Sequence, residues 1–406
     1  MSRLKKLTFF IGLLPFLMVL GNSMLIPILP AIERGLNLTA GQGSLVLSLF
    51  SFPAAIIIPF AGFLSDRYGR KRMIAISLWL IITGSVICAA SAYFPGYGLQ
   101  VLLAGRFIQG AGAAGTTPLA MALAGDLFTG GERAESLGIL EVYNGVGKVA
   151  APIIGAAAAM ISWGAVFWVF PVIGGLSYWG IRKNIKTHAS GKELESMKEY
   201  AGKLKSVFIR KAAILIPLFL LGGIGLFLLF GLLYFLSYHI QDTYHIDGFF
   251  KGFSFMFPLG ALTLTSYWTG NELKSNPDKK SPFLLLGTTV QFLMFGCILL
   301  FPSFSALLFF LTVAFSGLGF ILPSLNLIIT SSVDDGERGL VVSLYGTARF
   351  LGVALGPIVY GAWITSEHKM FLYTFLISVL SIVLYAVFRF RNYGWSGWSW
   401  MRKRFI

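Results

Sequence analysis

Ionisable side chains stand inside several long apolar stretches of this 406-residue chain. Glu141 is the only carboxylate well inside any predicted span, and Arg106, Lys148 and Arg349 are the cations in comparable positions. Charged groups within a membrane are costly, and those that occur commonly mark pathways for ions, protons or polar solutes. Burial favours the neutral form of a carboxyl group, whereas a nearby cation favours its charged form. A carboxyl group whose cationic neighbour can move away could therefore bind and release a proton.

The spacing around Glu141 places polar groups on one side of a helix. Glu141, Asn144 and Lys148 lie at positions i, i+3 and i+7, which share one helix face. A static Glu141–Lys148 pair that only stabilises the protein is the alternative to a proton site. Arg349 could bind an anionic group of a substrate or could pair with Glu141, and the sequence leaves both roles open.

The elements that position these residues follow from the composition. Hydrophobic residues make up 56% of the chain and charged residues 12%, about half the charge of an ordinary soluble domain. This excludes a disordered, collagen-like or nucleic-acid-binding protein. The apolar runs are long and do not alternate, so they predict membrane-spanning α-helices rather than barrel strands. Twelve spans are predicted, at residues 7–29, 43–64, 73–93, 99–124, 135–160, 163–181, 211–238, 249–270, 282–301, 304–329, 339–363 and 370–388.

The distribution of basic residues predicts the orientation of these spans. Of the 32 Lys and Arg residues, 26 fall in segments that share one side if the N-terminus is cytoplasmic. The opposite loops contain only Arg34, Lys251 and Lys369. Basic residues concentrate on the cytoplasmic side of membrane proteins. We therefore expect a multi-pass protein of the cell membrane with both termini in the cytoplasm, which requires an even number of spans.

An internal repeat divides the spans into two sets of six. Residues 1–182 and 211–388 are predicted to form two helical bundles, joined by a polar cytoplasmic connector at 183–210 and followed by a basic tail at 389–406. At an offset of 205 residues, Pro118 matches Pro323, Pro152 matches Pro357, and Gly131-Glu132-Arg133 matches Gly336-Glu337-Arg338. Parallel repeats of this kind place a substrate site near the membrane midplane, between the halves.

The loop after the second span reads Gly62-Phe63-Leu64-Ser65-Asp66-Arg67-Tyr68-Gly69-Arg70-Lys71-Arg72. Position for position, this string resembles the signature loop of the major facilitator superfamily, and the resemblance extends over essentially the whole chain. It implies the fold of twelve helices in two six-helix repeats. It also implies a gating role for the loop, including Gly62, Asp66, Arg67, Gly69 and Arg70, with Asp126 as the expected partner of Arg70.

Two further strings resemble motifs of that superfamily, and the one in span 5 resembles the motif that marks its drug/proton antiporter branch. The span-4 string from Gly105 to Gly115 contains Arg106, whose counterpart in the family is implicated in proton transfer. In span 5, Gly147, Pro152 and Gly155 match a helix-packing motif, and Gly356-Pro357 repeats it in span 11. Span 5 departs from the pattern, because Ala151 stands where a glycine is usual and Lys148 where a small or apolar residue is usual.

These patterns predict a transporter rather than an enzyme. The expected function is proton-coupled export of small amphipathic compounds or drugs by alternating access. The alternative is a carrier for a specific anionic or zwitterionic solute or a lipid-linked metabolite, working as a symporter, a uniporter or a flippase. Protons are the expected coupling ion, and Glu141, Arg106 and Lys148 are the residues expected to carry the coupling. No other cofactor is expected. The protein is expected to act as a monomer in the lipid bilayer. The residues expected to line the substrate cavity are Asn22, Asn144, Tyr143, Tyr234, Tyr238, Asn326 and Arg349.

A metal site is not expected. His239, Asp242, His245 and Asp247 cluster between spans 7 and 8, but a hydrated loop with scattered polar residues explains them better than a set of ligands.

Overall fold

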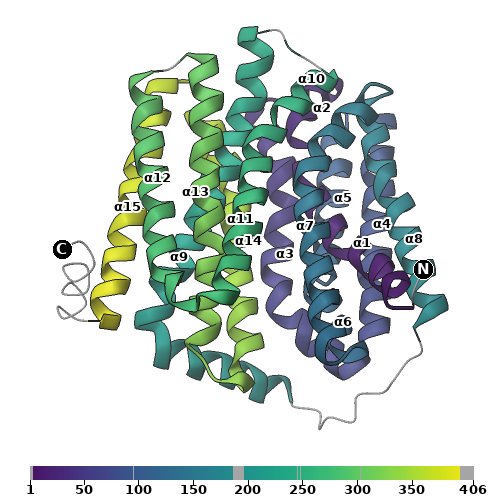
Figure 1. Cartoon of the computed structure of the whole chain (residues 1–406). Helices are drawn as coiled ribbons and strands as arrows, with labels where there is room; N and C mark the ends of the chain where they lie inside the picture. The colour runs from purple at the N-terminus through teal and green to yellow at the C-terminus, as the bar shows by residue number, and fades with distance from the viewer. Residues whose placement is uncertain are drawn as a thin grey trace.

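The computed structural model describes residues 3–94, 96–185, 196–244, 246, 248–301 and 303–393, and within these ranges the regular structure is helical. Figure 1 shows two bundles of helices side by side. The N-terminal bundle contains α1 (Arg3–Ser23), α2 (Leu29–Leu36), α3 (Ala40–Tyr68), α4 (Arg70–Ala90), α5 (Gly98–Ala113), α6 (Thr116–Leu127), α7 (Gly130–Ala159) and α8 (Val169–Asn184). The C-terminal bundle contains α9 (Met197–Tyr244), α10 (Gly248–Ser254), α11 (Met256–Ser275), α12 (Lys280–Leu300), α13 (Phe304–Ser331), α14 (Asp335–Trp363) and α15 (Glu367–Tyr393).

Ten helical stretches of the described residues are long and apolar enough to cross a membrane. The predicted spans 99–124 and 249–270 are not among them, and each is divided into two helices, α5 with α6 and α10 with α11. Proline lacks a backbone N–H and cannot donate to the carbonyl four residues earlier. Pro118 and Pro258 stand four residues after Ala114 and Ser254, where the two interruptions occur. Each proline therefore removes one backbone hydrogen bond at the interruption.

The first span is longer than the sequence predicted. A short 3-10 helix at Ile26–Ile28 and then α2 continue the direction of α1, so the candidate span reaches Leu36 instead of residue 29. This corrects the prediction that Glu141 is the only acid within a span, because Glu33 lies in α2 and is buried. We call the end of the molecule that carries α2 and α10 the α2 end, and the end that carries Asp66–Arg72 the basic end (Figure 1).

The connector between the bundles is partly helical, and its helix is continuous with the seventh span. Helix α9 runs for 48 residues, from Met197 to Tyr244, so the bundle boundary predicted at residue 211 falls inside a helix. Ser196 and Glu199 begin this helix with a reciprocal pair of side-chain-to-backbone hydrogen bonds, at 3.2 and 2.9 Å. Residues 186–195 of the connector and 394–406 of the predicted tail lie outside the described residues.

The two bundles pack closely along α3 and α14. The Ser48 hydroxyl donates to the carbonyl of Ala354 at 2.6 Å, and the Thr347 hydroxyl donates to the carbonyl of Ala55 at 2.7 Å. Nearer the α2 end, Gly252 of α10 packs on α7 so closely that a Cβ there would lie 2.7 Å from the carbonyl oxygen of Pro152. Small residues and hydroxyl groups therefore join the halves where the membrane supplies no hydrophobic driving force.

Candidate functional site

Glu141, Lys148 and Arg349 are brought together across the space between the two bundles. We call these three residues the central charge cluster. Lys148 of α7 lies within electrostatic range of Glu141 on its own helix and of Arg349 on α14. Both bundles thus contribute a cation to one region, and Glu141 is the acid within electrostatic range of Lys148 there. Asn144, on the same face of α7, is half-buried.

Several polar atoms around this cluster are buried and have no hydrogen-bond partner among the described residues. They are Nε of Arg349, the hydroxyl of Tyr345 and the hydroxyl of Thr263. The Arg349 guanidinium lies over the Tyr345 ring, 5.6 Å from its centroid. Thr263 of α11 faces α7, since a Cβ on Gly145 would lie 2.7 Å from its methyl carbon. Buried polar groups without partners are costly in a folded protein, so each of these atoms calls for a partner such as an ordered water, an ion or a ligand.

Arg106 belongs to a different network, inside the N-terminal bundle. Its side chain is completely buried, and its Nε donates to the carbonyl of Val46 at 2.8 Å. Its guanidinium also donates to Asn22 at 2.6 Å and to Gln109, and it lies 4.5 Å from the centroid of the Phe50 ring. Neutral acceptors and an aromatic face thus surround this cation. The structure therefore places Arg106 and Asn22 in one polar network, separate from the central charge cluster.

The other predicted cavity residues occupy three further places. Tyr143 packs inside the N-terminal bundle, where its ring fills the space beside Gly12 of α1. Asn326 of α13 is exposed. Tyr234 and Tyr238 of α9 are buried at the α2 end and contact the N-terminal bundle there. Of the seven, Arg349 and Asn144 are the residues that lie with the central charge cluster.

Arg70 holds the loop at the basic end together. Its guanidinium pairs with Asp66 at 2.6 Å and with Asp126 at 3.0 Å, and it also donates to the hydroxyl of Ser65. Gly69 makes the turn between α3 and α4 with φ +91°, a conformation that residues with a side chain rarely adopt. Gly62 is half-buried and Arg67 is exposed. One cation therefore ties the end of α3, the start of α4 and the end of α6.

Replacing Asp66 with asparagine should slow the transport cycle without weakening substrate binding. The substitution removes one of the two carboxylates that hold Arg70, and it leaves the pair with Asp126 in place. We expect a several-fold decrease in turnover, since an exposed ion pair contributes about 0.2–1 kcal/mol. Measurement of kcat and KM for transport checks this. An unchanged turnover with a raised KM would contradict a gating role for the loop.

The predicted packing glycines lie at close helix crossings. A Cβ on Gly155 would lie 2.1 Å from the carbonyl oxygen of Met24, and one on Gly356 would lie 2.6 Å from that of Phe227. Gly147 is less crowded, with 3.2 Å to the Phe16 ring. Pro152 and Pro357 lie inside α7 and α14 without interrupting them. These positions let α7 and α14 approach neighbouring backbones.

The residues between spans 7 and 8 form no metal site in the described part of the chain. His239 and Asp242 lie within α9, which corrects the expectation that they stand in a loop. Nδ1 of His239 lies 3.0 Å from a carboxylate oxygen of Glu367 at the start of α15. His245 and Asp247 lie outside the described residues.

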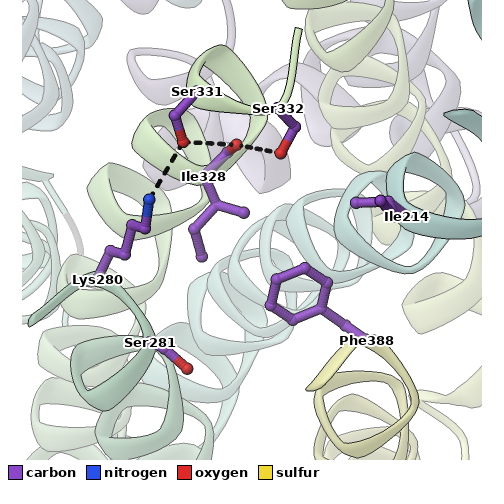
Figure 2. A pocket seen from close by; sticks show the side chains of 7 residues that line it. All are labelled: Ile214, Lys280, Ser281, Ile328, Ser331, Ser332 and Phe388. Carbon is purple, nitrogen blue, oxygen red and sulfur yellow. Dashed lines mark hydrogen bonds between the residues drawn. The ribbon is translucent and has the colours of Figure 1, made fainter. Parts of the chain in front are cut away.

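A separate cavity of about 260 Å³ opens at the basic end of the C-terminal bundle (Figure 2). Its polar side includes Lys280, whose Nζ lies 3.3 Å from the hydroxyl of Ser331, and Phe388 lies across from them. The lining comes from α9, α12, α13 and α15. Because these helices all belong to one bundle, the cavity is distinct from the region between the halves.

The sequence profile described as Major Facilitator Superfamily matches residues 11–357. The chain belongs to this superfamily, which confirms the resemblance carried by the loop at 62–72. The family consists of transporters rather than enzymes, and the chain is a multi-pass membrane transporter.

A full-length relative and two solved structures resemble the chain. The protein named Bacillibactin exporter of Bacillus subtilis (strain 168) is 33% identical over 373 residues, which are 91% of this chain and 93% of that protein. The human organic anion transporter MFSD10 (TETRAN) matches with a TM-score of 0.73 and 17% identity, covering 96% of this chain and 100% of that one. An inward-facing, unoccupied bacterial homologue of the human lysosomal transporter Spinster also matches with a TM-score of 0.73, at 14% identity over 96% and 97% of the two chains. The two structures support the fold alone.

Proposed function

We propose that the protein is a proton-coupled exporter of small amphipathic compounds, working by alternating access in the cell membrane. It has twelve spans, with the broken helices α5–α6 and α10–α11 counted as one span each. Its basic end and both termini face the cytoplasm, and it acts as a monomer with protons as the coupling ion. The excess of Lys and Arg at the basic end supports this orientation. The exporter named for bacillibactin supports export as the direction.

The observation that carries the proposal is the central charge cluster. An acid on α7 lies within reach of a cation on its own helix, and that cation faces a second cation on the opposite bundle. Movement of the bundles changes the distance from Lys148 to Arg349 without changing its distance from Glu141 along α7. The electrostatic field at Glu141 therefore depends on the conformation, which is the property that a coupling site needs.

A second candidate function is a carrier for an anionic or zwitterionic solute. Two cations against one acid leave the central charge cluster with an excess positive charge, and Nε of Arg349 has no partner among the described residues. An anionic group between Lys148 and Arg349 would satisfy that donor. This carrier could still be a proton-coupled exporter, so the two candidates differ in substrate class.

Flux measurements in proteoliposomes with an imposed pH gradient test both candidates. The test compounds are lipophilic cations, zwitterions and organic anions, with protein-free vesicles and vesicles treated with a protonophore as controls. We expect flux that follows the gradient and falls when the gradient is collapsed. Flux that does not depend on the imposed pH gradient would overturn proton coupling and indicate a facilitator. A strict preference for anions would select the second candidate.

A further inference from the structure

An acid is buried at the α2 end, where the two bundles meet, and the proposed coupling mechanism does not use it. Glu33 is 8% exposed, although it stands only three residues before the end of α2. Its carboxylate accepts a hydrogen bond from the hydroxyl of Tyr238, which belongs to α9 of the opposite bundle. The contact therefore links the two halves of the transporter.

Helix α3 and the turn that precedes it hold Glu33 in this position. A Cβ on Gly43 of α3 would lie 1.6 Å from a carboxylate oxygen of Glu33, so only glycine leaves room for the acid. Helix α2 ends with Asn37 in the left-handed conformation, at φ 52°, and α3 begins at Ala40 with a capping box. The short turn between α2 and α3 thus fixes the carboxylate against the neighbouring bundle.

Other contacts at the same place are made by neutral groups. The hydroxyl of Tyr234 donates to the carbonyl of Ala40 at 2.8 Å, and the hydroxyl of Ser237 donates to the carbonyl of Ile26 at 2.7 Å. The rings of Tyr234 and Tyr238 lie 4.8 Å apart. We call the contacts of Glu33, Tyr234, Ser237 and Tyr238 with the opposite bundle the outer seal. Opening of the α2 end must separate them and expose Glu33 to water.

The charges around Glu33 come from two helices of the opposite bundle. Lys251 of α10 is buried and within electrostatic range, but its ammonium donates to the side chain of Gln241 at 2.9 Å. Asp242 of α9 adds a repulsive negative charge. Among the described residues no cation forms an ion pair with Glu33. A carboxylate withdrawn from water without such a pair loses much of its hydration energy, and protonation removes that cost.

We propose that Glu33 binds a proton from the external solution when the outer seal closes and returns it to the same solution when the seal opens. The proposal rests on the proposed function for the orientation of the α2 end and for the two alternating states. The proton enters and leaves on one side, so it adds nothing to the transport stoichiometry. It makes the equilibrium between the states depend on external pH, with acid favouring the closed seal.

Distance measurements between spin labels test this without any substrate. Tyr93 and His368 are exposed near the α2 ends of opposite bundles, and both would be changed to cysteine in protein that lacks Cys88 and Cys297. Purified protein would be measured at a series of pH values from about 4 to about 8, which spans the titration of shifted carboxyl groups. We expect the ratio of open to closed protein to fall with acidification, by up to about tenfold per pH unit, the limit for one proton.

Three variants make the result specific to the outer seal. Glu33→Gln should remain mostly closed at every pH, and Glu272→Gln, at the basic end, should titrate like the parent. Tyr238→Phe keeps the acid and removes its donor, so it should open more at all pH values and keep the pH dependence. A parent protein with one pH-independent distance, or a Glu33→Gln protein that titrates normally, would overturn the proposal. If the parent protein shows no proton-driven flux in proteoliposomes, the proposed function is overturned. The pH dependence of the spin-label distances is measured independently of that flux.

Discussion

Replacement of Arg349 with glutamine should weaken transport of anionic compounds by about 10- to 100-fold in apparent affinity. A charge-assisted hydrogen bond contributes about 1.5–3 kcal/mol, and about 1.4 kcal/mol corresponds to a factor of ten. Nε of Arg349 is buried and without a partner among the described residues, and under the second candidate function an anionic group of the substrate supplies that partner. The apparent affinity for lipophilic cations should not decrease, since removal of a positive charge from the site does not weaken the binding of a cation.

The measurement is KM for an organic anion and for a lipophilic cation in the same proteoliposomes. Arg349→Lys is the matched control, because it keeps the charge next to Lys148 while changing the geometry of the donors. It should retain most of the affinity for anions. If the glutamine variant instead alters the pH dependence of flux and leaves KM for both compounds unchanged, Arg349 acts on Glu141 and not on the substrate.

The sequence was sufficient to predict those features of the fold and of the site that depend on the internal repeat and on local residue spacing. The offset of 205 residues predicted two matching bundles, and it paired position 144 with Arg349 in the opposite half. The i, i+7 spacing placed Glu141 and Lys148 on one helix face, and the structure brings Lys148 within electrostatic range of both other charges. The loop at 62–72 indicated Asp126 as the partner of Arg70, and the structure forms that ion pair at 3.0 Å.

The sequence did not predict where the first span ends or which residues of the opposite bundle its end contacts. The sequence predicts that the first span ends at residue 29, directly before Pro30, but Pro30 lies in the first turn of α2, where a missing N–H costs little. Glu33 was therefore placed outside the span. Tyr234 and Tyr238 are four residues apart and share one face of α9, as residues that line a cavity would. This spacing does not tell how far along the membrane normal the two side chains lie, and both belong to the outer seal.

One missed feature had a readable signal in the sequence. Ser196 and Glu199 are a serine and a glutamate three residues apart, the pattern of a capping box, and they mark the start of α9 fourteen residues before the predicted span at 211. The orphaned hydroxyls of Thr263 and Tyr345 had no such signal. Most threonines within helices donate to a carbonyl of the previous turn, so only the coordinates distinguish Thr263 from the others.

Glu141→Gln should abolish flux driven by the pH gradient and leave downhill flux and folding intact. Glutamine resembles the protonated acid in shape but cannot release a proton, so the central charge cluster would lose its one titratable acid. Glu141 is exposed within α7 and forms no ion pair or hydrogen bond with another described residue, so the change in unfolding free energy should stay within about 0.5 kcal/mol.

Glu135→Gln is the matched control, because it removes an equally exposed acid from the same helix, nearer the basic end. It should transport like the parent under the same gradient. Thermal unfolding of both variants separates a loss of coupling from a loss of structure. Gradient-driven flux that survives in Glu141→Gln would remove this acid from the mechanism. The search would then move to Arg106, the remaining ionisable group of the N-terminal bundle that the family motif connects with protons and that the structure buries completely.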